Sequence, residues 1–271
     1  MKKELLIATS LAITVVILAY IATLGGGLGP LFSDLRPLAE VFLGTTLNPE
    51  KRFFTAMSPE GVTAIVWDYR GLDTLFETAV FYLAIIGAVA IYRDISEKVG
   101  FKGGGLGLSK IVKVVTKLLI PINIAIAISI ALHGHLTPGG GFQAGAAMAV
   151  VPMILIVVFS RYFLLGLKLS KSLALAFRSI GLAGIALTVF LPIIMALLSG
   201  FNAYIMQNQV KANAPVGFPA YVGNVLISGS LILYNVFEFL AVTFGFSILF
   251  LLLSIEEDLV KEQMRGEVGE H

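Results

Sequence analysis

The chain has 271 residues, of which 57% are hydrophobic and only 13% charged, and its formal net charge is +2. Soluble domains carry about 25% charged residues, so this composition excludes a soluble protein and predicts an all-α, polytopic membrane protein. The lack of cysteine excludes disulfides, iron–sulfur ligation and thiolate chemistry, and three histidines do not favour a His-rich metal site. We therefore expect no cofactor and no metal centre.

The first apolar run covers residues 4–28 and follows Lys2 and Lys3. A secretory signal sequence has an apolar core of about 7–15 residues and a small-residue cleavage site. This run is longer and has no such site, so we expect a retained membrane helix. The polar segment 29–68 comes next, and a short surface helix is predicted there from the helical spacing of Leu35, Leu38, Ala39 and Phe42.

A basic, glycine-rich segment, 93–110, separates the first two spans from the others. Its GGGLG sequence has no preceding strand and no βαβ unit around it, so we interpret it as a flexible linker rather than a phosphate loop. The last apolar run, 220–254, is too long for one upright span and too short for two spans with a turn. Its length favours one long or tilted helix. The five spans predicted after the first are 71–92, 111–132, 142–163, 173–198 and 220–254.

The distribution of Lys and Arg predicts the orientation of these six helices. With a cytoplasmic N-terminus, the cytoplasmic segments hold most of the Lys and Arg, as the positive-inside rule requires. We therefore expect both termini in the cytoplasm, with the turn after the third span and the polar segment 199–219 on the outside. The outer side then receives only Arg36, Lys51, Arg52, Arg70 and Lys211.

Acidic residues within spans are the first candidates for function. A charged side chain there costs about 2.5–3.5 kcal/mol on insertion scales, so it faces protein or water. In WDYRGLDTLFETAVFYLA, Asp73 and Glu77 are four residues apart and share one helix face, with Arg70 close to both. For Asp73 we favour a capping pair with Arg70. For Glu77, one turn deeper, we favour binding of a proton or Na⁺ over a structural ion pair with a neighbouring subunit.

Glu238 is the other acid deep within a span, in the sequence ILYNVFEFLAV. If its helix is continuous to Ser254, Glu238 lies about 24 Å from the cytoplasmic end, in the outer half of the hydrocarbon. Asn235 precedes it by one turn on the same face. The pair can line a polar path, or it can form hydrogen bonds to another subunit.

The stretch HGHLTPGGGFQAGAAMA, from His133 to Ala149, joins two apolar runs. Histidine has a pKa near neutrality, so His135 is either a proton relay or an ordinary interfacial residue, and for His133 we favour the second. A small residue every fourth position gives the following helix a smooth packing face. The sharp turn and the close packing depend on Pro138, Gly139, Gly140, Gly141 and Gly145.

Two motifs in the chain resemble a known family. GHLTPGGGFQAG, with the spans of 111–254 around it, resembles the MrpB subunit of the Mrp-type multisubunit Na⁺/H⁺ antiporters. VTAIVWDYRGLDTLFETAVF is similar to the C-terminal end of the large MrpA subunit, and to the small subunit that replaces it in archaeal membrane-bound hydrogenases. The chain thus looks like a fusion. Its expected parts are a two-helix segment (1–99), a linker (100–110), a four-helix segment (111–256) and a charged cytoplasmic tail (257–271).

The resemblance implies roles for individual residues. In the family, the acid of the RGLDTLFE-type motif is thought to lie on the cation or proton pathway, which assigns that role to Glu77. The histidine of the GH-PGGG motif corresponds to His135. Where the family pattern leads us to expect an acid in the last span, this chain has Asn235, and Glu238 follows three residues later. If Glu238 takes the place of that acid, the pathway is kept.

The resemblance also implies a non-catalytic membrane subunit that helps to form a Na⁺/H⁺ pathway in the plasma membrane. Its expected partners are other Mrp-type subunits, hydrogenase-like or complex I-like subunits, Na⁺, H⁺ and lipid, with no nucleic acid. The parent complex is either a free antiporter or a ferredoxin-driven hydrogenase or sulfane reductase. The alternative is a purely structural subunit that carries no ions. A self-contained carrier is disfavoured because no internal repeat is visible.

Overall fold

The computed structural model describes residues 2–25, 35–92, 107–167, 170–255 and 261. Most of the predicted linker and the predicted tail, apart from Lys261, lie outside these residues. The prediction of an all-α protein with six spans is confirmed, because six helices in the described part of the chain are long and apolar enough to cross a membrane. These helices are α1 (Lys2–Leu24), α4 (Gly71–Ile91), α5 (Lys110–His133), α6 (Gly141–Phe159), α8 (Lys171–Ser199) and α9 (Ser230–Leu253).

The chain divides into two compact units, residues 1–41 and 42–271. The first unit contains α1, whose threonine hydroxyl groups form hydrogen bonds within the helix. Thr9, Thr14 and Thr23 each donate a hydrogen bond of 2.8–2.9 Å to the carbonyl oxygen four residues earlier. Such internal bonds allow polar side chains in a span where lipid offers no partner. The short helix α2 (Pro37–Thr46) follows and runs across the boundary between the units.

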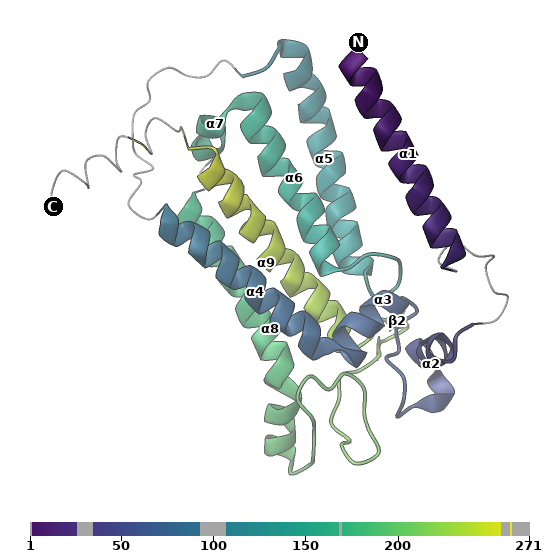
Figure 1. Ribbon diagram of the computed structural model, residues 1–271. Helices are drawn as coiled ribbons and strands as arrows, with labels where there is room; N and C mark the ends of the chain where they lie inside the picture. Colours follow the sequence, from purple (N-terminus) through teal and green to yellow (C-terminus); the bar gives the residue numbers. More distant parts are fainter. Residues whose placement is uncertain (1, 26–34, 93–106, 168–169, 256–260, 262–271) are drawn as a thin grey trace, which may run out of the picture. The chain divides into compact units, whose positions relative to one another are not determined.

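The second unit is a helix bundle built around α9. Figure 1 shows α9, in yellow-green, with α4 and α8 on one side and α5 and α6 on the other. Glycines let the neighbouring helices approach its backbone closely. A Cβ atom at Gly145 of α6 would lie 2.6 Å from Val242, and one at Gly181 of α8 would lie 2.6 Å from the Phe237 oxygen. Close packing of this kind drives helix association in lipid.

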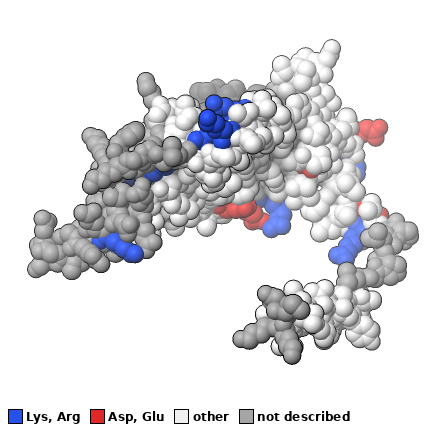
Figure 2. All heavy atoms as spheres, turned by 90° about the horizontal axis from the view of Figure 1, so that it is seen from above, with Lys and Arg blue, Asp and Glu red and all other residues white. Residues whose placement is uncertain are grey.

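The surface of the bundle is largely uncharged. In the view of Figure 2, most of the described surface consists of uncharged residues, and the charged ones form a few small groups. Large apolar side chains such as Leu83, Ile122 and Leu187 are more than half exposed on the helices. An apolar exterior on helices of this length is the arrangement that a lipid environment stabilises.

One end of the bundle is an ordered layer of loops, formed by residues 42–70, 134–140 and 200–229, and is called the loop end below. Side chains join the three segments: Ser58 Oγ donates to the His135 oxygen at 2.6 Å, and Asn208 Nδ2 donates to the Ala56 oxygen at 2.9 Å. The short elements of this layer are η1 (Pro49–Lys51), α3 (Gly61–Thr63), the π-helix η2 (Ala64–Tyr69), β1 (Tyr221–Val222) and β2 (Val225–Leu226).

The prediction of one long helix over 220–254 is wrong. Strands β1 and β2 pair antiparallel, with Val222 opposite Val225, and only Gly223 and Asn224 connect them. Such two-residue turns require a positive φ, and Gly223 has φ +59°. Gly229, with φ +64°, then precedes the first residue of α9. Two left-handed glycines thus interrupt the apolar run before the helix can form.

The fourth span also ends earlier than predicted. Helix α6 stops at Phe159 instead of residue 163, because Ser160 adopts φ +97°, which a right-handed helix does not accept. The chain then continues as the short helix α7 (Arg161–Gly166). This break leaves α6 with 19 residues, still close to the length that spans the hydrocarbon.

Candidate functional site

A cavity of about 130 Å³ lies between η2, α4, the start of α6 and α9. It brings together Glu77, Asn235, Glu238, Gly139 and Gly140, which the sequence proposes separately as pathway and turn residues. We call it the acid cavity, because two carboxylic acids line it. The other polar side chains in its wall belong to Thr63, Trp67, Thr74 and Gln143.

Glu238 is the buried acid of this cavity, with 6% of its surface exposed. The Trp67 indole N–H donates a hydrogen bond of 3.3 Å to Glu238 Oε2, and the backbone N–H of Phe142 donates another. Phe142 is in the first turn of α6, where free N–H groups and the helix dipole favour a negative charge. The Glu238 carboxylate is therefore held at the positive end of a helix.

This arrangement depends on Gly141, the first residue of α6. A Cβ atom at Gly141 would lie 2.7 Å from Glu238 Oε2 and 2.5 Å from the Asn235 carbonyl oxygen. Both distances are shorter than the contacts of real Cβ atoms, so only glycine lets the α6 terminus come this close to the carboxylate. The preceding Gly139 has φ +141°, a conformation that glycine adopts without strain.

Asn235 fixes the turn between α5 and α6. Its side chain is fully buried, and its Oδ1 accepts a hydrogen bond of 3.3 Å from the Gly141 N–H. Its Nδ2 is buried without a hydrogen-bond partner among the described residues, and it lies next to Gly134, where a Cβ atom would be 2.9 Å away. Asn235 thus caps α6 and presents an unused donor beside the cavity.

Glu77 lies on the open side of the acid cavity. It is in the second turn of α4 and is exposed on the surface of this chain. Glu77 and Glu238 interact electrostatically, and no ion pair reaches either of them from the residues that the structure describes. Two carboxylates with amide and hydroxyl oxygens nearby are ligands that hard cations prefer, and carboxylates also bind protons.

Residues 111–248 match a family model described as a domain related to the MnhB subunit of Na⁺/H⁺ antiporter, and they make up just over half of the chain. The chain belongs to this MnhB-related family. An uncharacterized protein of Methanocaldococcus jannaschii is 24% identical over 231 residues, which cover 77% of this chain and 82% of that protein.

Two solved structures share the fold of this MnhB-related chain. One is from the membrane-bound sulfane sulfur reductase, an archaeal respiratory membrane complex, with a TM-score of 0.62 and 23% identity over 94% of this chain and all of that one. The other is from the Mrp complex of Dietzia sp., with a TM-score of 0.61 and 18% identity. It matches 95% of this chain, which spans only 26% of the Dietzia chain.

The acid cavity crosses the boundary of the MnhB-related region. That region contributes Gln143, Asn235 and Glu238, whereas Trp67 and Glu77 come from the segment before it. Helix α4 also packs on α9 through Ile85, whose neighbours include Ile248 and Leu252. The MnhB-related helices and α4 therefore form one packed body, and the cavity exists only when both are present.

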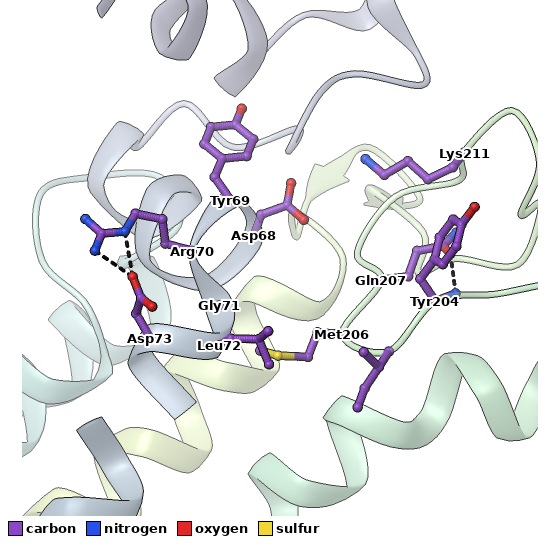
Figure 3. A pocket seen from close by; sticks show the side chains of 11 residues that line it. Asp68, Tyr69, Arg70, Gly71, Leu72, Asp73, Tyr204, Met206, Gln207 and Lys211 are labelled. Carbon is purple, nitrogen blue, oxygen red and sulfur yellow. Dashed lines mark hydrogen bonds and ion pairs between the residues drawn. The ribbon is translucent and has the colours of Figure 1, made fainter. Parts of the chain in front are cut away.

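The structure places Asp73 outside the acid cavity. Its carboxylate pairs with Arg70 at the start of α4, with 2.6 Å between Nη2 and Oδ2 and 2.7 Å between Nε and Oδ2 (Figure 3). Both side chains are more than 60% exposed, so the pair is solvated and contributes about 0–1 kcal/mol. Asp73 instead lines a second cavity with Asp68 and Lys211.

His135 is buried in the loop end and does not line the acid cavity. Its Nε2 lies 3.1 Å from the Leu226 carbonyl oxygen, and its own carbonyl oxygen accepts from Ser58 Oγ at 2.6 Å and from the Glu60 N–H at 3.4 Å. Burial lowers the pKa of His135, and the hydrogen bond to Leu226 only partly offsets this effect. The neutral ring joins β2 to the turn after α5. Pro138, in the same turn, is exposed.

Sequence reasoning missed several residues of the site. Trp67 is the only tryptophan of the chain and lies in a segment predicted as polar loop, yet it is 1% exposed and bonded to Glu238. Gln143 lies inside the PGGGFQAG motif, so its position in the signature turn was an available signal. Thr63 donates a hydrogen bond of 2.5 Å to the Gly134 oxygen, a contact that no local pattern predicts. Among the described residues, no group of three or more His, Cys, Asp or Glu could hold a metal ion.

Proposed function

We propose that this chain is a non-catalytic membrane subunit of a multisubunit Na⁺/H⁺ antiporter and that the acid cavity is part of its sodium and proton pathway. The observation that carries the proposal is the meeting of Glu77 and Glu238, from helices far apart in sequence, in one cavity. Each carboxylate within a span costs about 2.5–3.5 kcal/mol of insertion free energy, and acids in such positions typically have a function. Membership of the MnhB-related family supports the same role.

The lack of local counter-charges favours this proposal over a purely structural subunit. A structural role predicts that the acids form salt bridges or complete hydrogen-bond networks. Within the described part of the chain, Glu77 has no such partner, and Glu238 is held only by neutral N–H donors. These donors orient the carboxylate but leave its charge free to be neutralised by a proton or a cation.

The exposure of Glu77 supports assembly with other Mrp-type subunits. An exposed carboxylate in the second turn of a membrane helix would face lipid if this chain were alone. We infer that a neighbouring subunit covers this side of α4 and completes the pathway. The parent complex is either a free antiporter or a ferredoxin-driven respiratory complex, in line with the two folds that this chain shares.

The proposal includes the topology and the origin of the two parts. The Lys and Arg distribution supports two cytoplasmic termini, so that the loop end faces the outside of the plasma membrane. The segment 1–99, which contains α4, corresponds to the C-terminal end of the large MrpA subunit, fused to the MnhB-related helices. Helix α4 packs on α9, and this packing supports such a fusion. The fusion keeps the two halves of the acid cavity in a single chain.

Glu77→Gln in the assembled complex tests the proposal. We expect Na⁺/H⁺ exchange in inverted membrane vesicles, followed with a pH-sensitive dye, to fall about 10²-fold or more, while the subunits still copurify. Glu50→Gln is the matched control, because Glu50 is an exposed acid of the loop end that lines none of the cavities described. An assembled Glu77→Gln complex with near-normal exchange would instead establish the purely structural role.

A further inference from the structure

A second cavity, of about 490 Å³, lies at the loop end between η2, the start of α4 and the segment 204–211. Consecutive residues of η2 line different cavities: Trp67 lines the acid cavity, and Asp68 lines this one. We call it the loop-end cavity. Its other polar side chains are Tyr69, Arg70, Asp73, Tyr204, Gln207 and Lys211 (Figure 3).

Asp68 is the unpaired acid of the loop-end cavity. Among the described residues, no hydrogen-bond donor and no ion-pair partner reaches its partly buried carboxylate. Figure 3 shows the Asp68 carboxylate and the Lys211 amine pointing toward one another across the cavity. Burial raises the pKa of Asp68 to about 6, and the charge of Lys211 opposes this rise. The carboxyl group therefore changes its charge close to physiological pH.

Three of the other titratable groups that line the cavity, Tyr69, Arg70 and Asp73, are already engaged. Arg70 is paired with Asp73, and the Tyr69 hydroxyl donates to Thr45 Oγ1 at 2.8 Å. Tyr204 lines the cavity from the segment opposite η2. A hard cation such as Na⁺ takes several oxygen ligands, and the Lys211 ammonium faces the side of the cavity where the Asp68 carboxylate lies. A proton needs only the carboxylate, so the cavity favours proton binding over sodium binding.

Tyr234 interacts with one residue of each cavity. It is fully buried, and its ring stacks on Trp67 with 4.4 Å between the ring centroids. Its hydroxyl has no hydrogen-bond partner among the described residues and interacts electrostatically with Asp68. Tyr234 also shares one face of α9 with Glu238, four residues later. Tyr234 thus carries an unused donor that interacts with Asp68, and it lies one turn from Glu238.

We propose that Asp68 is a second proton-binding site of this subunit, which takes up and releases protons at the loop-end cavity and exchanges them with the acid cavity past Tyr234. This inference rests on the proposed function, because a proton bound at Asp68 contributes to exchange only if the acid cavity is part of the pathway. Only protons move in this step: the Asp68 carboxylate gains a proton from water and later gives it up, and no bond between heavy atoms changes.

The test is the pH profile of Na⁺/H⁺ exchange in vesicles that contain the full complex. We expect Asp68→Asn to lower the exchange rate about tenfold and to remove the part of the pH dependence centred near pH 6. Lys211→Gln removes the charge that opposes the rise of the Asp68 pKa, so the midpoint of the pH profile should move to higher pH. Tyr234→Phe keeps the stacked ring and removes the hydroxyl, so the rate should fall without a shift of the midpoint.

The outcomes separate this inference from the proposed function. If Glu77→Gln abolishes exchange while Asp68→Asn and Lys211→Gln both keep the wild-type rate and pH profile, the acid cavity works without Asp68 and the inference is wrong. If Glu77→Gln is fully active, the proposed function itself fails. Should Asp68→Asn not assemble, the Lys211→Gln midpoint decides the question, since an unshifted midpoint excludes Asp68 as the titrating group.

Discussion

The Trp67 indole nitrogen lies 3.3 Å from Glu238 Oε2, and this bond joins the segment before the MnhB-related region to the central helix of the bundle. Both side chains are buried, and the indole also stacks on Tyr234, with 3° between the ring planes. The stack fixes the indole in its own plane, and the indole N–H then fixes the direction of the carboxylate. The orientation of Glu238 thus depends on a residue outside the family region.

We predict that Trp67→Phe weakens both the fold and the site. A hydrogen bond to a charged group contributes about 1.5–3 kcal/mol, and a smaller ring also leaves a gap beside Tyr234. The variant complex should unfold at lower temperature, and the freed carboxylate should give a higher half-saturating Na⁺ concentration for exchange. Phe54→Leu is the control, since Phe54 is 73% exposed in the same segment. Unchanged Na⁺ dependence in Trp67→Phe would show that the indole does not orient the acid.

The spans and the acids of the site were predictable from the sequence, whereas the cavity was not. Hydropathy identifies a membrane helix because lipid selects some 20 apolar residues whatever their partners are. The shared face of Asn235 and Glu238 follows from helix geometry alone. The contact of Trp67 with Glu238 depends on the π-helix η2 and on the packing of α4 against α9, which no local pattern contains.

The hairpin before α9 illustrates a different loss of information. Its strands, Tyr221–Val222 and Val225–Leu226, have the same apolar residue types as the helix that follows. Composition therefore merges them into one apolar run. The two-residue Gly-Asn connection was the available signal, because glycine followed by asparagine is typical of tight hairpin turns. Hydropathy alone does not reveal this turn.

We predict that Gly141→Ala separates α6 from the Glu238 carboxylate. The added methyl group would meet the Asn235 oxygen and the Glu238 side chain at 2.5–2.7 Å, and overpacking of this kind costs about 1–3 kcal/mol. Exchange should fall, and the thermal midpoint of the complex should drop. Gly87→Ala in α4 is the matched control: nothing lies within 4 Å of the new Cβ, so the helix should gain about 0.5–1 kcal/mol. Equal stability of the two variants would contradict the close approach.

His135 should make the stability of this subunit depend on pH. Burial lowers its pKa below the ordinary value of 6.5, so between these two pKa values the unfolded chain binds more protons than the folded one. Stability is then complete above the unfolded pKa and is lost as the pH falls below about 6.5. Asp68 has the opposite effect below about pH 6. Because its pKa is raised to about 6 in the folded state, acidification there stabilises the fold.

The difference between variants isolates the contribution of His135. The thermal midpoint of the purified complex should be measured from pH 7.5 to pH 5.5 for the wild type, His135→Gln and His133→Gln. His135→Gln removes the titrating ring, so its loss of stability on acidification should be smaller than that of the wild type. His133 is exposed at the end of α5 and is the smallest of the causes that act on the His135 pKa, so His133→Gln should change the slope less than His135→Gln does. Identical slopes for all three proteins would mean that the buried ring does not resist protonation.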